Sequence, residues 1–269
     1  MPSGITAILT AYNRPHILEE QLKAVQNQSL PPDDVMLWYN KGESPQYQVE
    51  GVKTAICNWN AKYIGRFAYA LLAKTPFVAI FDDDTIPGKD WFANCWSVIE
   101  WAASCNNPLC ILGGAGVLLD GQAYDPCRKI GWSNPNIEIA EVDLVGHAWF
   151  FPRILLAALW SDTPISWDNG EDMQFAFLAQ KYADAKCYVP PHPPGQKNLW
   201  SSIKGHLGVD AVANSANVNQ VEHARQRNEI AAECIKKGWK TVKMRNPAPA
   251  PVNPDDPDNK IIPFPIQKI

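Results

Sequence analysis

Three consecutive acids, Asp82, Asp83 and Asp84, directly follow an apolar segment that reads Phe-Val-Ala-Ile-Phe. Adjacent carboxylates repel one another unless a cation lies between them. Oxygen ligands suit Mg²⁺ or Mn²⁺, and either ion can also hold two phosphate oxygens. If the apolar segment is a buried strand, the acids lie at its carboxyl end, where open α/β sheets bind ligands. The segment therefore predicts a divalent-metal site, and the alternative is a solvated acidic turn.

Strand-type segments alternate with helical stripes over the first hundred residues. The expected strands are residues 5–9, 35–39, 54–57 and 77–81. After the first strand, Asn13 is expected to cap a helix that has Pro15 in its first turn. A second helix is expected from the apolar spacing of Trp59, Tyr63, Phe67, Ala70 and Leu71. This alternation predicts an α/β fold with a mostly parallel central sheet and helices on both faces.

Beyond residue 84 the pattern predicts further elements of both kinds. Strands are expected at 109–112, 144–151 and 186–189, and helices at 90–104, 153–160, 172–182 and 217–237. Gly238 is expected to end the last helix. Residues 246–269 hold seven prolines, a composition that suits an extended tail rather than a packed unit.

The overall composition excludes some classes of protein. The net charge of −4 is not that of a general nucleic-acid binder, although residues 192–245 carry nine Lys/Arg against four Asp/Glu. Seven cysteines, an odd number without tight spacing, argue against a disulfide framework and for a reducing, cytoplasmic setting. The longest apolar runs are too short for a transmembrane segment, and no signal peptide is expected.

The segment Thr-Ala-Tyr-Asn-Arg after the first strand, followed later by Asp-Asp-Asp, resembles the GT-A glycosyltransferases. The resemblance covers roughly residues 4–195. It implies that the opening segment holds the nucleobase and ribose of a nucleotide-sugar donor, and that the Asp-x-Asp motif binds the metal. The implied donor-binding residues include Thr10, Ala11, Tyr12, Asn13, Arg14, Asp82 and Asp83. Asp84 and Asp82 are the implied metal ligands.

The resemblance also implies a division of the chain. Residues 1–195 would form the catalytic domain, with the nucleotide-sugar half at about 1–105 and the acceptor half at about 106–195. Residues 196–245 would be a helical, basic region that completes the site, followed by the proline-rich tail.

Asn58, Asn60 and the pair Arg66-Phe67 precede the three acids. They are similar to an arrangement in the exostosin-like retaining transferases, where such side chains help to bind the nucleotide diphosphate. Asn60 and Arg66 are therefore expected to bind the donor, since a guanidinium group suits phosphate geometry. The alternative is that Arg66 is an exposed helix residue.

The segment Val-Gly-His-Ala-Trp-Phe-Phe at 145–151 resembles the glycine-containing strand that lines the acceptor side of this fold. Gly146, His147 and Trp149 are thus expected to face the acceptor or the sugar. A glycine would let the sugar approach the backbone closely. For His147, a contact with the donor sugar and a packed core position are both open.

Glu171 and Asp172 begin an amphipathic helix, where the helix dipole by itself favours acids. The family places an acidic pair here, facing the acceptor. In inverting members it removes a proton from the acceptor hydroxyl, and in retaining members it stabilises positive charge beneath the anomeric carbon. Asp172 is the first choice for the catalytic carboxylate and Glu171 the second.

Many members of this fold supply a last metal ligand, often a histidine, from the region after the strand at 186–189. His192 is the first candidate here and His206 the second. Cations from the same part of the chain could neutralise the leaving diphosphate. The candidates for this role are Lys197, Lys204 and Arg225.

Together these features predict a metal-dependent glycosyltransferase, of hexosyl or N-acetylhexosaminyl type, that uses Mn²⁺ or Mg²⁺ and a UDP-sugar. The acceptor could be a glycan, a protein or a hydroxymethylated DNA base, and spacing leaves retention or inversion open. A nucleotidyltransferase is disfavoured, because it would carry a Gly-rich, Lys/Arg-bearing loop after the first strand. The alternative of another class is a non-catalytic, metal-dependent carbohydrate-binding protein, in which some of the eleven tryptophans line a sugar groove.

Overall fold

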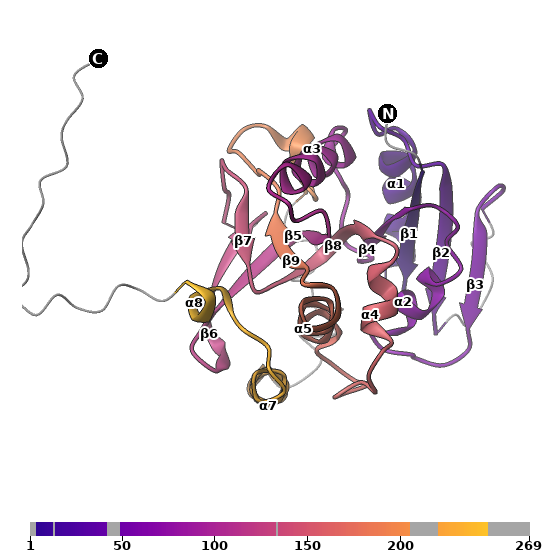
Figure 1. Ribbon diagram of the computed structural model, residues 1–269. Helices are drawn as coiled ribbons and strands as arrows, with labels where there is room; N and C mark the ends of the chain where they lie inside the picture. Colours follow the sequence, from indigo (N-terminus) through magenta and orange to yellow (C-terminus); the bar gives the residue numbers. More distant parts are fainter. Residues whose placement is uncertain (1–3, 13, 42–48, 133, 205–219, 247–269) are drawn as a thin grey trace, which may run out of the picture.

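The computed structural model describes residues 4–12, 14–41, 49–132, 134–204 and 220–246. Nine strands in this part of the chain form one sheet, in the order β3-β2-β1-β4-β8-β5-β9-β7, with β6 paired to β5 (Figure 1). The strands are β1 (Ile5–Ala11), β2 (Asp34–Asn40), β3 (Lys53–Cys57), β4 (Phe77–Phe81), β5 (Cys110–Asp120), β6 (Ala123–Gly131), β7 (Ala140–Val142), β8 (Leu144–Pro152) and β9 (Lys186–Val189).

The sheet is mixed, with most strands running one way. Strands β1 to β4 pair in parallel with their neighbours. Strand β8 lies antiparallel between β4 and β5, and β9 is parallel to β5. Strands β6 and β7 also run antiparallel to their partners. Six of the nine strands (β1 to β4, β5 and β9) therefore share a direction, as the predicted mostly parallel sheet requires.

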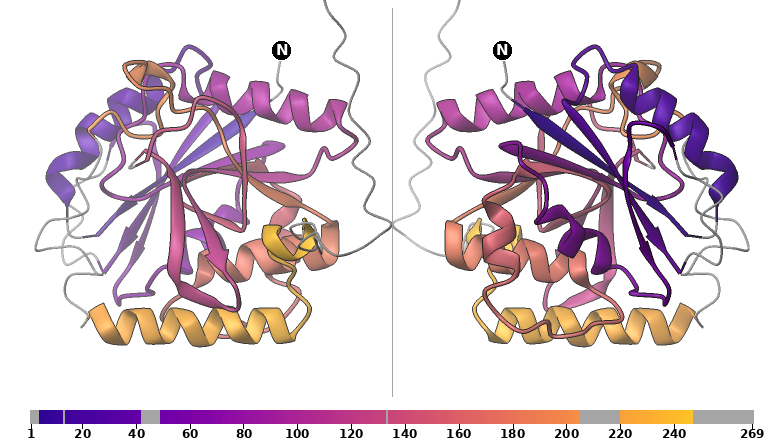
Figure 2. Two further views of the ribbon diagram at one scale, coloured as in Figure 1. Left: turned by 90° about the vertical axis from the view of Figure 1, so that its left-hand side faces the viewer. Right: turned by 90° about the vertical axis from the view of Figure 1, so that its right-hand side faces the viewer.

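Helices cover both faces of the sheet (Figure 2). They are α1 (Pro15–Gln26), α2 (Gly65–Ala70), α3 (Trp91–Ser104), α4 (Leu155–Leu159), α5 (Glu171–Ala183), α7 (Gln220–Lys236) and α8 (Val242–Arg245), with a 3₁₀ turn η1 at Lys197–Leu199. Helices α1 and α3 bury one face of β1, including Ala7 and Leu9. Helices α2, α4, α5 and α7 belong to the core on the other face, which includes Ile8. A strand buried on both faces needs mostly apolar residues, which is why β4 reads as a continuous apolar segment and β1 as an apolar one interrupted only by Thr6 and Thr10.

The helix expected from the stripe that starts at Trp59 is shorter than predicted, because α2 begins only at Gly65. Side chains hold the preceding residues in turns instead. Asn60 Oδ1 accepts a hydrogen bond from the Lys62 backbone N–H at 2.9 Å, and Asn40 Oδ1 accepts one from the Ala61 N–H at 2.9 Å. Asparagine side chains that bind nearby backbone groups compete with helix formation. Trp59 is therefore not a core residue.

Other differences lie in the second half. Strand β5 continues to Asp120 and turns into β6 at Gly121, whose φ of 91° favours glycine. Strands β6 and β7 and helix α8 were not expected. The described part of the last predicted helix is α7, while the Asn13 cap, His206 and residues 247–269 lie outside the described residues.

Two further observations bear on the class of protein. All seven cysteines are free thiols. Within the residues that the structure describes, no helix has the length and apolar character needed to span a bilayer.

Candidate active site

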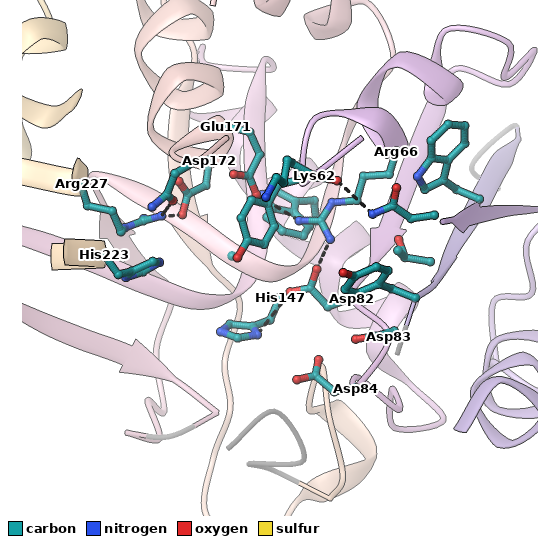
Figure 3. A pocket seen from close by; sticks show the side chains of 18 of the residues that line it. Lys62, Arg66, Asp82, Asp83, Asp84, His147, Glu171, Asp172, His223 and Arg227 are labelled. Atoms are coloured by element: carbon teal, nitrogen blue, oxygen red, sulfur yellow. Dashed lines mark hydrogen bonds and ion pairs between the residues drawn. The ribbon is translucent and has the colours of Figure 1, made fainter. Parts of the chain in front are cut away.

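A cavity of about 320 Å³ opens at the carboxyl ends of β1, β2 and β4 (Figure 3). The parallel register brings these ends together, since Ala11 lies beside Tyr39 and Leu9 beside Phe81. Strand β8 and the N-terminus of α5 form further walls, and α7 contributes two side chains. Most of the predicted site residues line this cavity: Thr10, Tyr12, Arg14, Arg66, Asp82, Asp83, Asp84, Gly146, His147, Trp149, Glu171 and Asp172.

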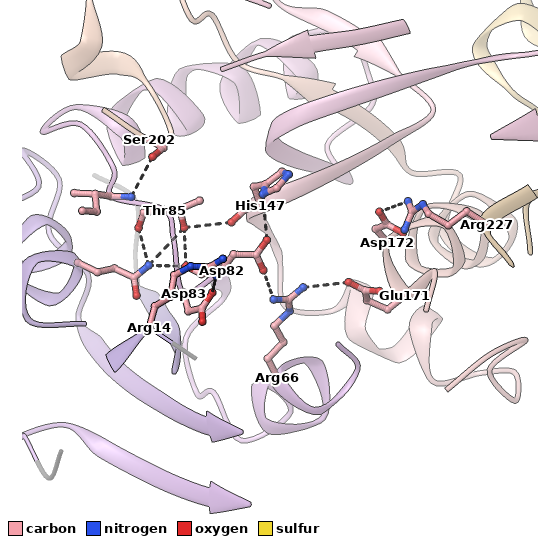
Figure 4. A network of polar contacts seen from close by, with 12 residues as sticks. Arg14, Arg66, Asp82, Asp83, Thr85, His147, Glu171, Asp172, Ser202 and Arg227 are labelled. Atoms are coloured by element: carbon pink, nitrogen blue, oxygen red, sulfur yellow. Dashed lines mark hydrogen bonds and ion pairs between the residues drawn. The ribbon is translucent and has the colours of Figure 1, made fainter. Parts of the chain in front are cut away.

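Polar groups hold in place the turn that carries the three acids, of which Figure 4 shows Asp82 and Asp83. The Gln21 amide donates to the carbonyl oxygens of Asp82 and Thr85, at 2.7 and 2.6 Å. The Thr85 hydroxyl also donates to the Asp82 carbonyl at 2.9 Å. The Asp82 N–H donates to the His147 carbonyl at 3.0 Å, which ties the turn to β8. The positions of the acids are thus set by α1 and β8 as well as by β4.

Asp82, Asp84 and His147 form the candidate metal site, with one ligand atom of each within 4.8 Å of the others. His147 has a φ of 67°, a left-handed conformation that is uncommon outside glycine. Such backbone strain concentrates at functional sites. His147 Nδ1 lies 3.4 Å from Asp82 Oδ2. The open alternative of a packed core position does not describe His147, whose ring faces the cavity in Figure 3.

The pKa values of the two carboxylates in this group are shifted in opposite directions. Burial raises the pKa of Asp82, but the charge of Arg66 and the contact with His147 outweigh it, so the pKa is lowered. Burial and then the charge of Asp82 raise the pKa of Asp84 to about 6. Asp84 Oδ1 is buried and has no hydrogen-bond partner among the described residues. Asp84 is thus a carboxylate that a cation would stabilise.

The donor set fits a divalent cation. Two carboxylates and an imidazole suit Mn²⁺ or Mg²⁺, with oxygen ligands in the majority. The orphaned oxygen of Asp84 and its raised pKa are what a carboxylate shows when its positive partner is lacking. The residues present therefore fit the ion that the sequence predicted.

His192 does not join this group, and the structure corrects its predicted role as a metal ligand. It is fully buried, and its Nδ1 lies 2.7 Å from the Pro190 carbonyl oxygen. Its Nε2 lies 3.0 Å from Ser201 Oγ. Both ring nitrogens are occupied, so neither offers a lone pair to a metal. The histidine beside the acids is His147, which the sequence assigned to the sugar.

Arg66 joins the two acidic groups of the cavity. One guanidinium nitrogen pairs with Asp82, and the other lies 3.1 Å from Glu171 Oε1. The guanidinium group also stacks on the Trp149 ring, 4.6 Å from its centroid. Arg66 is only 5% exposed, so the alternative of a solvated helix residue is wrong.

Arg14 and Asp83 form a second ion pair at 2.7 Å, also nearly buried. Asn60, predicted to bind the donor, does not line the cavity. It donates to the Tyr12 hydroxyl at 3.0 Å and accepts from the Asn40 amide at 2.9 Å, behind the cavity wall. Ala11 also lies behind the wall, packed in the core.

Glu171 and Asp172 occupy the first turn of α5, after Gly170 with a φ of 77°. A Cβ on Gly170 would lie 2.7 Å from Ile230 Cδ1, so a side chain there would also displace the end of an α7 side chain. Burial, and then the charge of Asp172, raise the pKa of Glu171 to about 7 despite its contact with Arg66. Asp172 pairs with Arg227 of α7 at 2.6 Å.

Arg227 is the main site residue that the sequence analysis missed. Its other nitrogen donates to Asn169 Oδ1 at 3.2 Å, and its guanidinium group lies 4.1 Å from the Tyr124 ring centroid. A signal was available, because Arg227 shares a helix face with the buried residues Ile230, Ala231 and Cys234. An arginine on an apolar stripe is expected to have a buried partner.

The cations predicted to neutralise the diphosphate do not line the cavity. Arg225 is exposed and pairs with Glu222 and Glu229 on its own helix. Lys204 pairs with Glu20 at the surface. The cations that line the cavity, besides Arg14, Arg66 and Arg227, are Lys62 and Lys129, with His223 beside them.

Comparisons with known proteins found similarity to solved structures. No protein family model matches this chain, and no curated protein matches it. Among solved structures it is similar to TarS 1–349 from S. aureus in complex with UDP, with a TM-score of 0.50 and 15% identity over 69% of this chain and 60% of that one. Another structure of TarS 1–349 gives a TM-score of 0.49 and 15% identity over 70% of this chain and 60% of that one. A third structure, described simply as TarS, gives a TM-score of 0.49 and 16% identity over 70% of this chain and 36% of that one.

This chain therefore spans less than two thirds of the length of the TarS chains that it matches. The likeness to the UDP complex concerns the fold, and TarS is a GT-A glycosyltransferase. Strand order, helices on both faces and this likeness together show that the chain has the mixed α/β GT-A fold that its sequence predicted.

Proposed function

We propose that this chain is a metal-dependent glycosyltransferase that moves a hexosyl or N-acetylhexosaminyl group from a UDP-sugar to an acceptor hydroxyl. One observation carries the proposal: the acids of β4 and those of α5 face a single cavity, with Arg66 between them. The proposed site for the metal and diphosphate and the proposed proton acceptor would thus share one cavity. The UDP in the similar TarS structure supports a nucleotide donor.

The nucleoside would occupy the ends of β1 and β2. Thr10, Tyr12 and Arg14 line this part of the cavity, together with Trp38 and Asn40 of β2. The Tyr12 hydroxyl is held by Asn60, and Asn40 holds Asn60 in turn. Asn60 is thus proposed to position the donor site from behind rather than to contact the nucleotide.

Asp82, Asp84 and His147 would hold the Mn²⁺ or Mg²⁺ ion. The bound ion would act as a Lewis acid on the leaving diphosphate. Arg66, Lys62 and Lys129 line the same cavity and would add positive charge near the phosphates. Arg66 also keeps Asp82 ionised, because its charge lowers the pKa of that carboxyl group.

The acidic pair of α5 would act on the acceptor. A general base works best when its pKa lies near the operating pH, and Glu171 has a pKa of about 7. Glu171 would therefore take the proton of the acceptor hydroxyl. Asp172, held by Arg227, would face the same substrate. Both are candidates for the catalytic carboxylate.

We also propose that residues 1–195 form the catalytic domain and that 196–245 complete its site. Arg227 and His223 of α7 line the cavity, which supports this division. The seven free cysteines suit the reducing, cytoplasmic setting that we propose for the protein.

The test is release of nucleotide from UDP-glucose and from UDP-N-acetylglucosamine, with Mn²⁺ or with EDTA. We expect release with Mn²⁺ that EDTA abolishes, and loss of release in Asp84→Asn. Arg225→Ala, on the exposed face of α7, is the matched control and should behave as wild type. Failure of the wild-type protein either to bind UDP by calorimetry or to release it would reject the proposal and favour a non-catalytic carbohydrate-binding protein.

A further inference from the structure

A second cavity, of about 530 Å³, adjoins the candidate active site. Four tryptophans line it, and it is called the tryptophan groove here: Trp38, Trp59, Trp160 and Trp167. It lies between the turns before α2 and the segment that joins α4 to α5. Trp38 and Lys62 line both cavities, so the groove lies next to the proposed donor site.

The groove keeps two large aromatic side chains in solvent. Trp59 is 65% exposed and Trp167 is 55% exposed, although the two are far apart in sequence. Single exposed apolar residues are common, but two indoles that line one concave surface form a patch, and such patches mark binding sites. Neither side chain belongs to the core, since both are more than half exposed.

The polar groups of the groove narrow the chemistry of its occupant. The exposed Asp168 lies at the groove, and its carboxylate can accept hydrogen bonds. A ligand that fits must offer a flat apolar face to the exposed rings and hydroxyl groups to this carboxylate and to solvent. A pyranose ring has both, because its C–H bonds project from one face and its hydroxyls lie around the edge.

Charge argues against a nucleic-acid strand. Single-stranded nucleic acids bind where aromatic rings accompany a positively charged path for the backbone. Among its described lining residues the groove has one cation, Lys62, and one anion, Asp168. A neutral ligand suits this balance better than a polyanion.

From this geometry we infer that the tryptophan groove binds a neutral oligosaccharide segment of the acceptor, alongside the active-site cavity. The inference rests on the proposed function for its biological role. Binding of the sugar itself does not require turnover, so the two can fail separately.

The experiment measures binding of maltohexaose, cellohexaose and chitohexaose to the full chain by saturation-transfer NMR and titration. We expect at least one of them to bind, and Trp59→Ala/Trp167→Ala to weaken that binding by about tenfold or more, as loss of central aromatic contacts does. The double Trp→Phe variant should retain most of the binding, because it keeps a ring at each position. Trp101→Ala removes an exposed tryptophan of α3 and serves as the matched control.

Two parallel measurements separate the possible failures. UDP binding with Mn²⁺ and donor hydrolysis should be unchanged in Trp59→Ala/Trp167→Ala, since neither residue lines the active-site cavity. Loss of UDP binding in that variant would assign the groove to the nucleobase and overturn the inference. The inference would also be overturned if none of the three sugars bound, or if a deoxythymidine decamer bound more tightly than they do. A wild-type dimer in sedimentation that becomes a monomer in the double variant would overturn it too. Sugar binding without any donor hydrolysis would instead contradict the proposed function, while the inference that the groove binds a sugar would still hold.

Discussion

Arg227 of α7 holds Asp172 of α5: its Nη2 donates to Asp172 Oδ2 at 2.6 Å, across 55 residues of sequence. Both side chains are nearly buried. The pair fixes one carboxylate of the candidate site with a residue from α7, which lies outside the proposed catalytic domain of residues 1–195. That helix is therefore a structural part of the site.

Arg227→Ala should both destabilise the fold and slow transfer. Removing one partner of a buried ion pair costs about 3 kcal/mol or more, because the other charge stays buried and unpaired. Arg227→Lys should recover part of the stability but not the contact geometry with Asn169, since lysine lacks the planar guanidinium group. Chemical denaturation and transfer kinetics on the two variants check this. An Arg227→Ala protein with wild-type stability and rate would show that the pair is incidental.

Asp84→Asn should abolish the response of the protein to Mn²⁺. Wild-type melting temperature should rise with Mn²⁺, because a ligand that binds only the folded state stabilises it. In EDTA at neutral pH the variant should melt above wild type. The pKa of Asp84 is raised to about 6 on folding, so its stabilising contribution is present below pH 3.8, its ordinary value, and is lost as the pH rises through 6. Thermal shift with Mn²⁺ and with EDTA measures both effects, and an equal Mn²⁺ response in variant and wild type would contradict them.

The rate of transfer should rise with pH through about 7 if Glu171 is the base. Its pKa is raised to about 7, and only the ionised form accepts a proton. Glu171→Gln should lower the rate by about a hundredfold or more and remove this limb of the pH profile. The measurement is kcat against pH at saturating donor. A profile that keeps the same limb in Glu171→Gln would assign it to another group.

Asp172→Asn distinguishes a catalytic acid from a structural partner of Arg227. If Asp172 acts on the substrate, donor affinity should change little while the transfer rate falls by about a hundredfold. If it serves only the ion pair with Arg227, the rate should stay intact and the stability should fall by about 3 kcal/mol, because Arg227 stays buried without its charged partner. Melting temperature and rate are measured on the same protein. Full activity would leave Glu171 as the only acid of this pair to test further.

The two histidines should respond in opposite ways to substitution. His147→Ala should weaken Mn²⁺ binding by about tenfold or more, as loss of a ligand does, with little change in metal-free stability. His192→Ala should lower stability by about 2 kcal/mol, since it leaves the buried Ser201 hydroxyl without its partner, and should not alter Mn²⁺ affinity. Calorimetric titration of Mn²⁺ and denaturation curves decide between them. Weaker metal binding in His192→Ala alone would restore its predicted role as a ligand.

Features set by short-range patterns were visible in the sequence. The alternation of apolar strands and helical stripes predicted the α/β fold. A strand buried on both faces is mostly apolar, so it can be recognised from its own residues without knowledge of its neighbours. The acids at 82–84 follow such a strand, and the parallel register then brings them beside Tyr12 and Asn40. The acids at 171 and 172 were visible for a similar reason, since they begin a helix.

Tertiary structure decided which side chains meet these acids. The sequence does not separate His192 from His147, but the structure bonds the buried His192 ring to Pro190 and Ser201, while strand β8 places His147 beside Asp82. Arg227 and Arg225 are two residues apart on one helix, and although the apolar stripe indicates which of them is buried, only packing of α7 against α5 shows that Arg227 meets Asp172. Such choices depend on contacts between residues far apart in the chain, whose free energies no local pattern contains.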